Sequence, residues 1–445
     1  MKKITTQLIM AIVLTACAMP GYAQLKQAAQ QQRSIATGNN TRKAATVKQS
    51  LSPDAIRTYR VHIPEEDIVE LRKRLKATRW PDKETVADAS QGVQLNRLQS
   101  LLQYWSTGYN WRKVEATLNA LPQFITTIDG VDIQFMHVRS KEANALPLIL
   151  THGWPGSPLE FLKAIDPLTN PVAHGGKATD AFDVVIPTIP GYGFSGKPTD
   201  GGWNPDRIAK AWDVLMKRLG YTRYVSQGGD HGSVISDALA RLAPEGLLGI
   251  HLTMPATVPS ELVAGINGGA AAPAGLAGDE LKAYNTLSAF FGRAAAYGAM
   301  MVTRPQTIGY GLTDSPSGLA AFTFEKIDAW SDNNGYPQGV LTRDEILDDI
   351  SLYWFTNTGA SSSRFYWENN NNNFSAAAQK TDQIKVPVAI TVFPKEIYQA
   401  PESWSRKAYP SLYYFHRAPK GGHFAAWEQP ELFSVEMREA FRSLR

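Results

Sequence analysis

One acidic residue stands where a folded chain could present a nucleophile. An extended run from Tyr224 ends in Gly228-Gly229-Asp230-His231-Gly232, and a helical pattern follows over 234–242. Small residues on both sides of a central side chain favour a sharp turn from a strand into a helix, and such a turn exposes the central side chain. We therefore predict that Asp230 lies at the tip of this turn.

A carboxylate in that position implies a two-step chemistry. An aspartate is ionised near neutral pH, so it needs no base to act as a nucleophile. Attack on an alkyl carbon, such as that of an epoxide or a haloalkane, would leave an ester on Asp230 that water must cleave. A histidine is then needed as general base, and a second acid must orient that histidine. The alternative is an ordinary Asp-x-Gly turn.

Two distant residues are candidates for these partner roles. His423 lies in a glycine-rich loop between the last predicted strand and the final predicted helix, and Glu396 follows the penultimate predicted strand. Asp382 precedes that strand and Glu402 lies further along, so both are weaker candidates. We predict that His423 is the base and Glu396 the orienting acid.

A third segment, His152-Gly153-Trp154-Pro155, directly follows a predicted strand. The main-chain N–H groups of Trp154 and His231 are expected to stabilise the negative charge that forms when water attacks the ester. Both roles are main-chain, and we assign no chemistry to the His152 side chain. The sequence leaves open whether the bond before Pro155 is cis.

The elements around these residues predict one α/β fold. Strands alternate with helices at lengths that suit right-handed crossovers, which favours a mostly parallel sheet. Residues 255–360 contain few strand signals, and we interpret this insertion as a helical lid. The predicted strands lie at 59–63, 124–138 (a hairpin around Asp129-Gly130), 146–150, 182–186, 224–228, 248–253, 386–393 and 412–416, and the predicted helices outside the lid at 64–77, 95–109, 111–121, 205–219, 234–242 and 430–444.

Charge and the amino terminus indicate where the protein acts. Nine of the 45 basic residues fall within residues 1–60 beside one acid, Asp54, so the rest of the chain is slightly acidic and suggests no nucleic-acid partner. Lys2-Lys3 and the apolar run Leu8–Ala16 resemble an export signal, too short for a transmembrane span of the mature protein. Cleavage before Gln24 and lipidation of Cys17 remain alternatives, and we favour soluble export to a bacterial periplasm or the outside.

Several motifs together resemble those of the epoxide hydrolases of the microsomal, xenobiotic type, over about residues 55–440. The resemblance implies an α/β-hydrolase fold, Asp230 as nucleophile, Glu396 as acid and His423 as base. It also implies that lid tyrosines Tyr366 and Tyr297 donate to the epoxide oxygen. The motifs are Thr78-Arg79-Trp80-Pro81, His152 to Ser157, Gly228-Gly229-Asp230, Thr313-Asp314-Ser315-Pro316 and Gly421 to Ala426.

The resemblance also implies a small hydrophobic epoxide and water as reactants, a vicinal diol as product, and no metal or organic cofactor. The family usually has Trp after the nucleophile, where this chain has His231, and this difference affects the expected substrate preference. We divide the chain into a signal peptide at 1–23, a disordered tether at 24–54, an epoxide hydrolase N-terminal region at 55–140, a hydrolase core at 141–254 and 381–445, and a lid at 255–380.

Two other functions are compatible with parts of the sequence. A haloalkane dehalogenase would use the same nucleophile, but it needs donors for a halide, and His231 removes the obvious second one. A secreted binding protein on a decayed hydrolase scaffold is the non-enzymatic alternative, and the intact Asp230, Glu396 and His423 disfavour it.

Overall fold

A nine-stranded sheet forms the centre of the protein, in the order β1-β2-β3-β5-β4-β6-β7-β8-β9. The computed structural model describes residues 52, 54–332, 339–370 and 373–445. The predicted signal peptide, and all of the predicted tether except Ser52 and Asp54, lie outside the described residues. The strands are Arg57–Thr58 (β1), Gln123–Ile128 (β2), Val131–Val138 (β3), Leu146–Thr151 (β4), Phe182–Pro187 (β5), Tyr224–Gly228 (β6), Leu247–Leu252 (β7), Val388–Val392 (β8) and Leu412–Arg417 (β9).

The sheet is parallel where the candidate residues lie. Every pairing from β5 through β4, β6, β7 and β8 to β9 is parallel, and the pairings among β1, β2, β3 and β5 are antiparallel. The mostly parallel sheet is thus confirmed. Because parallel strands end at one edge of a sheet, the loops after β4, β6, β8 and β9 meet there. These four loops contain Trp154, Asp230, Glu396 and His423.

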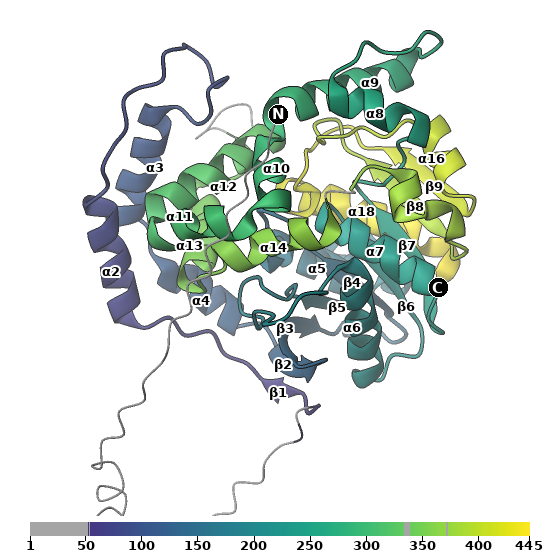
Figure 1. Cartoon of the computed structure of the whole chain (residues 1–445). Helices are drawn as coiled ribbons and strands as arrows, with labels where there is room; N and C mark the ends of the chain where they lie inside the picture. Colours follow the sequence, from purple (N-terminus) through teal and green to yellow (C-terminus); the bar gives the residue numbers. More distant parts are fainter. Residues whose placement is uncertain (1–51, 53, 333–338, 371–372) are drawn as a thin grey trace, which may run out of the picture. The chain divides into compact units, whose positions relative to one another are not determined.

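Helices cover the parallel part of the sheet (Figure 1). The α6 helix begins as predicted, because the Asn204 side chain accepts a hydrogen bond from the Arg207 N–H at 3.0 Å. The hairpin is also confirmed, since Asp129 and Gly130 both have positive φ between β2 and β3. The main helices outside the insertion are Ile165–Thr169 (α5), Pro205–Arg218 (α6), His231–Leu242 (α7), Glu402–Ala408 (α16), Ala425–Glu428 (α17) and Pro430–Ala440 (α18).

Three helices precede the sheet hairpin: Glu65–Lys76 (α2), Leu95–Thr107 (α3) and Trp111–Asn119 (α4). The predicted apolar face of α2 is buried. The strand predicted at 59–63 is wrong, because β1 ends at Thr58. Val61 and Ile63 are buried as in a strand, but their N–H groups donate to the side chains of Asn119 and Glu115 on α4 instead of to a neighbouring strand.

The chain between β7 and β8 contains no strand among its described residues and forms helices α8 to α15. In Figure 1 the green helices α10 to α14 lie beside α2, α3 and α4, and α12 contacts both α2 and α3. The helices are Ser260–Gly268 (α8), Gly278–Ala289 (α9), Ala296–Thr303 (α10), Pro305–Asp314 (α11), Pro316–Trp330 (α12), Arg343–Phe355 (α13), Gly359–Asn369 (α14) and Ala376–Gln379 (α15).

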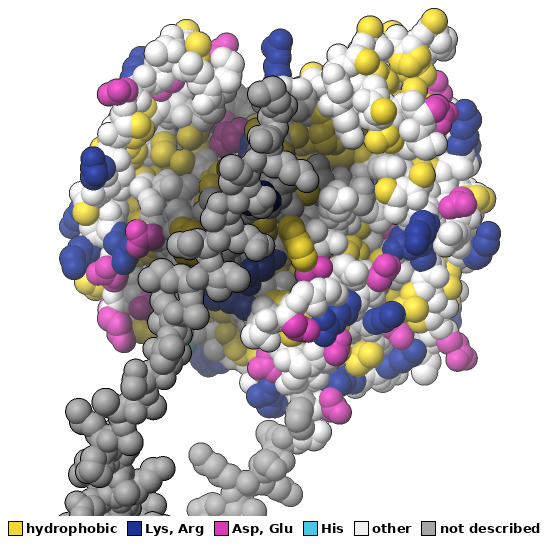
Figure 2. Space-filling view, in the orientation of Figure 1, with side chains coloured by type: hydrophobic (Ala, Val, Ile, Leu, Met, Phe, Trp, Pro, Cys, Tyr) yellow, Lys and Arg dark blue, Asp and Glu magenta, His cyan; other side chains and the backbone are white. Residues whose placement is uncertain are grey.

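The described surface is mixed in charge on the face that Figure 2 shows, where basic and acidic side chains are interspersed. Apolar side chains gather there around α8 and α9. Within the described part of the chain, no helix combines the length and the hydrophobicity that a membrane crossing requires.

Candidate active site

The backbone at Asp230 forms the predicted sharp turn. The β6 strand ends at Gly228, α7 begins at His231, and Asp230 between them has φ 48°. A Cβ atom on Gly228 would lie 2.0 Å from the carbonyl oxygen of Gly232, and one on Gly232 would lie 2.0 Å from that of Thr151. These close approaches explain why glycine flanks the aspartate, since any side chain would force the backbones apart.

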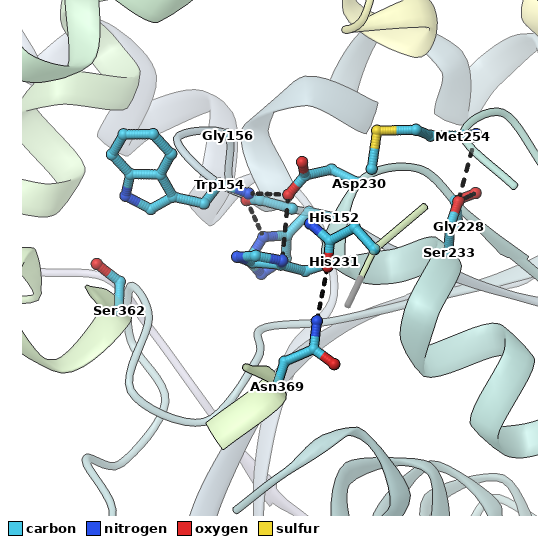
Figure 3. A network of polar contacts seen from close by, with 12 residues as sticks. His152, Trp154, Gly156, Gly228, Asp230, His231, Ser233, Met254, Ser362 and Asn369 are labelled. Atoms are coloured by element: carbon cyan, nitrogen blue, oxygen red, sulfur yellow. Dashed lines mark hydrogen bonds and ion pairs between the residues drawn. The ribbon is translucent and has the colours of Figure 1, made fainter. Parts of the chain in front are cut away.

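The Asp230 carboxylate is buried and held from several sides. The Trp154 N–H donates to its Oδ1 at 2.9 Å, and His231 Nδ1 lies 3.4 Å from the same oxygen, as Figure 3 shows. The Nε2 atom of His423 lies 3.5 Å from Oδ2. Burial alone would raise the pKa of Asp230. The charges of His231 and His423, both protonated at the low pH where this carboxyl titrates, and the Trp154 N–H outweigh burial and hold this pKa below its ordinary value. The carboxylate is therefore ionised and available to attack.

His423 is paired with the predicted acid. Its Nδ1 lies 2.6 Å from Oε1 of Glu396, and both side chains are buried. Of the weaker candidates, Asp382 lies in a short 3-10 helix before β8, and Glu402 pairs with Arg406 on α16. The structure thus brings Glu396 to the imidazole. Burial would lower the pKa of His423, but Glu396 and Asp230 raise it well above its ordinary value, so the resting imidazole is protonated.

The two predicted tyrosines lie together on the insertion. Tyr297 of α10 stacks on the Trp154 ring at 5.2 Å, and Tyr366 of α14 meets the same ring edge-on at 5.7 Å. Their own ring centroids are 5.9 Å apart. The Tyr366 hydroxyl is buried and has the Tyr297 hydroxyl as a polar neighbour, but the two make no hydrogen bond of ordinary geometry. Burial raises the pKa of both phenols, so they remain protonated hydrogen-bond donors.

Two other histidines near Asp230 are neutral. Burial lowers the pKa of His231 to about 4 and that of His152 to about 4. The His231 ring packs against Phe365 at a centroid distance of 4.0 Å, and His152 Nε2 accepts a hydrogen bond from the Ile189 N–H. The main chain thus holds the His152 ring, and its lack of a chemical role stays a prediction. The His231 N–H opens α7, where main-chain donors have no partner within the helix.

Further polar residues line the cavity that contains Asp230 and His423, among them Glu160 and Gln227. Nothing in the sequence singles out Glu160, because it follows Ser157-Pro158 as an ordinary first-turn acid of a helix would. Glu160 lies beside Asp230 only because the loop after β4 folds back towards the end of β6. The cis bond between Trp154 and Pro155 lies in that same loop.

Comparison with known proteins agrees with this geometry. Residues 56–161 match the family model described as epoxide hydrolase N terminus, and residues 147–430 match that of the alpha/beta hydrolase fold. The chain is 51% identical over 390 residues to a Stigmatella aurantiaca protein named "Putative epoxide hydrolase", covering 88% of this chain and 86% of that protein. It is 34% identical to epoxide hydrolase 1 of Oryctolagus cuniculus, covering 87% and 89%.

Solved structures give the same result. The crystal structure of juvenile hormone epoxide hydrolase from the silkworm Bombyx mori has a TM-score of 0.77 at 31% identity, over 88% of this chain and 95% of that one. The structure of Aspergillus niger epoxide hydrolase has a TM-score of 0.75 at 29% identity, over 88% and 97%. The fold is therefore the α/β-hydrolase fold, and the chain belongs to the epoxide hydrolase family.

Proposed function

We propose that this protein hydrolyses small hydrophobic epoxides to vicinal diols through an ester on Asp230. The observation that supports this most directly is the arrangement of three side chains. An ionised Asp230 lies next to His423, which Glu396 orients at 2.6 Å. Asp230 supplies the nucleophile for the first step. His423, which lies between Asp230 and Glu396, supplies the base for the second step.

Ring opening is the first step. An Asp230 oxygen attacks one epoxide carbon, the C–O bond breaks, and negative charge develops on the epoxide oxygen. Tyr297 and Tyr366 are the donors to that oxygen, because both phenols stay protonated and their hydroxyls lie side by side, without a hydrogen bond of ordinary geometry at Tyr366 among the described residues. The Trp154 and Trp330 rings pack against Tyr297, and Phe322 packs on Trp154, so the surroundings favour an apolar substrate.

Ester hydrolysis is the second step, and the first step prepares it. When Asp230 becomes an ester it loses its negative charge, so one of the two carboxylates that raise the pKa of His423 is gone. The imidazole then releases its proton more readily and can take one from water. The Trp154 N–H, which now binds Oδ1, is placed to stabilise the oxyanion that forms at Asp230.

A single turnover with excess enzyme in ¹⁸O-labelled water tests this function. The first diol is expected to contain no solvent label, because its new oxygen comes from Asp230, and the label is expected in the Asp230 carboxylate after turnover. Label in the first diol would contradict the covalent route. Halide release from chloroalkanes without diol formation from styrene oxide would instead indicate a dehalogenase.

We also propose that the protein is exported, on the basis of the basic and apolar start of the sequence. Cleavage before Gln24 and lipidation of Cys17 predict different mature amino termini. Intact-mass analysis of the protein from a bacterial host, with Cys17→Ser as the matched variant, distinguishes them. A mature chain that retains Met1 would contradict export.

A further inference from the structure

The small cavity beside Asp230 is the size of a water molecule. Asp230 and His423 line it together with Glu160 and Gln227, two residues that the mechanism above does not use. The space open to water centres is about 20 Å³, and one buried water needs roughly 10–15 Å³ on this measure. A buried water also needs two to four polar partners, and these four side chains supply them.

Glu160 contributes an acceptor to this cavity. It lies in the 3-10 helix Pro158–Ala164, and its side chain is 9% exposed. Its Oε1 atom is buried and makes no hydrogen bond of ordinary geometry among the described residues, although the Gly153 N–H lies near enough to lower the pKa of the carboxyl slightly. A buried carboxyl oxygen of this kind is unfavourable unless a ligand or a water satisfies it.

The loop after β4 packs closely against the side chains of Asp230 and Glu160. A methyl group on Gly153 would lie 2.5 Å from Oδ1 of Asp230, and one on Gly156 would lie 2.9 Å from Oε1 of Glu160. Figure 3 shows Gly156 close to Trp154, whose N–H holds Asp230. One tight backbone segment thus fixes the position of Glu160 relative to the nucleophile.

We propose that Glu160 Oε1 accepts one O–H of the hydrolytic water while His423 Nε2 accepts the other. A water held in this way directs its oxygen lone pair at the Asp230 ester carbon. This role rests on the proposed epoxide hydrolase function, and it adds a second water-binding group to the base. Burial raises the pKa of Glu160 to about 8, so the acid is neutral at pH 7 and adds no charge beside Asp230.

The step balances without any further reactant. The water oxygen bonds to the ester carbon of Asp230, one water proton moves to His423, and the second O–H stays bound to Glu160. The bond from the ester carbon to the diol oxygen then breaks, and that oxygen takes the proton from His423. Before the attack His423 gives its resting proton to the tyrosine that donated during ring opening, and after the ester breaks the proton left on Asp230 returns to His423. Epoxide and water thus form diol, and the enzyme regains its starting charge.

Separate measurement of the two steps tests the role of Glu160. Single-turnover kinetics give the rate of ester formation and the rate of ester hydrolysis, and intact mass shows the covalent adduct. For Glu160→Leu, which removes the acceptor, we expect hydrolysis about 10- to 100-fold slower, ester formation within about 3-fold of wild type, and an accumulating adduct. For Glu160→Gln, which keeps an acceptor oxygen, we expect hydrolysis within about 5-fold of wild type.

Gly156→Ala tests the same role without removing the acid. Its methyl group would displace Glu160 Oε1, so hydrolysis is again expected to slow more than ester formation. Gly311→Ala is the matched control, because a methyl group there meets no atom within 4 Å. Asp237→Asn is the control for loss of a buried acid outside the cavity, since Asp237 does not line it and accepts a hydrogen bond from Tyr409.

The outcomes separate this inference from the proposed function. If neither wild type nor His423→Gln forms an adduct, the covalent mechanism itself fails, and the role of Glu160 fails with it. If adducts form but Glu160→Leu or Gly156→Ala hydrolyses its ester at the wild-type rate, only the role of Glu160 is overturned. Equal slowing of both steps in these variants would also overturn it, since that pattern indicates a structural effect.

Discussion

Nδ1 of His423 lies 2.6 Å from Oε1 of Glu396, and Nε2 of the same ring lies 3.5 Å from Oδ2 of Asp230. One buried imidazole therefore connects the acid after β8 to the nucleophile after β6. A carboxylate flanks the ring on each side, and these two negative charges raise the pKa of His423. This arrangement makes the protonation of His423 depend on whether Asp230 is free or esterified.

Asp230→Asn is expected to lower the pKa of His423. The substitution removes one of the two carboxylates that raise this pKa, as esterification does, while Glu396 stays in place. A pH titration of the His423 ring signals by NMR measures the change. The raised pKa of the surface residue His174, which Asp166 and Glu431 cause, should stay the same. An unchanged His423 pKa would contradict the proposed switch of His423 from acid to base.

Glu396→Gln is expected to slow ester hydrolysis by about 10²- to 10⁴-fold, because the amide cannot stabilise the imidazolium or fix its tautomer. Ester formation should change much less, so the adduct accumulates and is visible by mass. Glu402→Gln is the matched control, since Glu402 pairs with the exposed Arg406 on α16, away from His423. Similar losses in both variants would show that Glu396 has no special function.

Tyr366→Phe is expected to slow ring opening by about 10- to 100-fold without loss of stability. The substitution removes a buried hydroxyl that makes no hydrogen bond of ordinary geometry among the described residues, so the free energy of unfolding should stay close to that of wild type. Rapid-quench measurement of ester formation and a thermal melt check the two parts. Tyr310→Phe is the control on an exposed tyrosine. A large loss of stability with normal ring opening would indicate a packing role only.

Asp349→Asn is expected to make stability less dependent on pH. Burial raises the pKa of Asp349 to about 8 from the ordinary value of 3.8. Between these values the folded state binds more protons than the unfolded state, so the free energy of unfolding falls as pH rises through this window. Denaturant unfolding at pH 5 and pH 8.5 should show this fall reduced by on the order of 3 kcal/mol in the variant.

The exposed Asp279 on α9 gives the comparison for this measurement. It pairs with Arg417 at the surface, so Asp279→Asn should leave the pH dependence of unfolding close to that of wild type. A fall in stability between the two pH values that is as large in Asp349→Asn as in wild type would mean that Asp349 is already ionised when folded.

The strands and helices outside the insertion could largely be predicted from sequence, because their signals are local. The glycines around Asp230 and the Asn204 cap act within a few residues of their own position. The strand predicted at 59–63 failed for the opposite reason. Alternating buried residues there suggested a strand, but α4 supplies the hydrogen bonds through Asn119 and Glu115. A local sequence pattern cannot predict a contact with residues more than fifty positions away.

The sequence by itself determined the proposed chemistry, since a carboxylate between close-packed glycines and a histidine in a late loop indicate a nucleophile and its base. Only the tertiary structure decided how closely Glu396 approaches His423, how Tyr297 and Tyr366 meet over Trp154, and that Glu160 shares a cavity with Asp230. Backbone constraints are local and can be recognised in a sequence. Distances between loops depend on the parallel order of the strands, and pKa values depend on burial, so both exist only once the chain has folded.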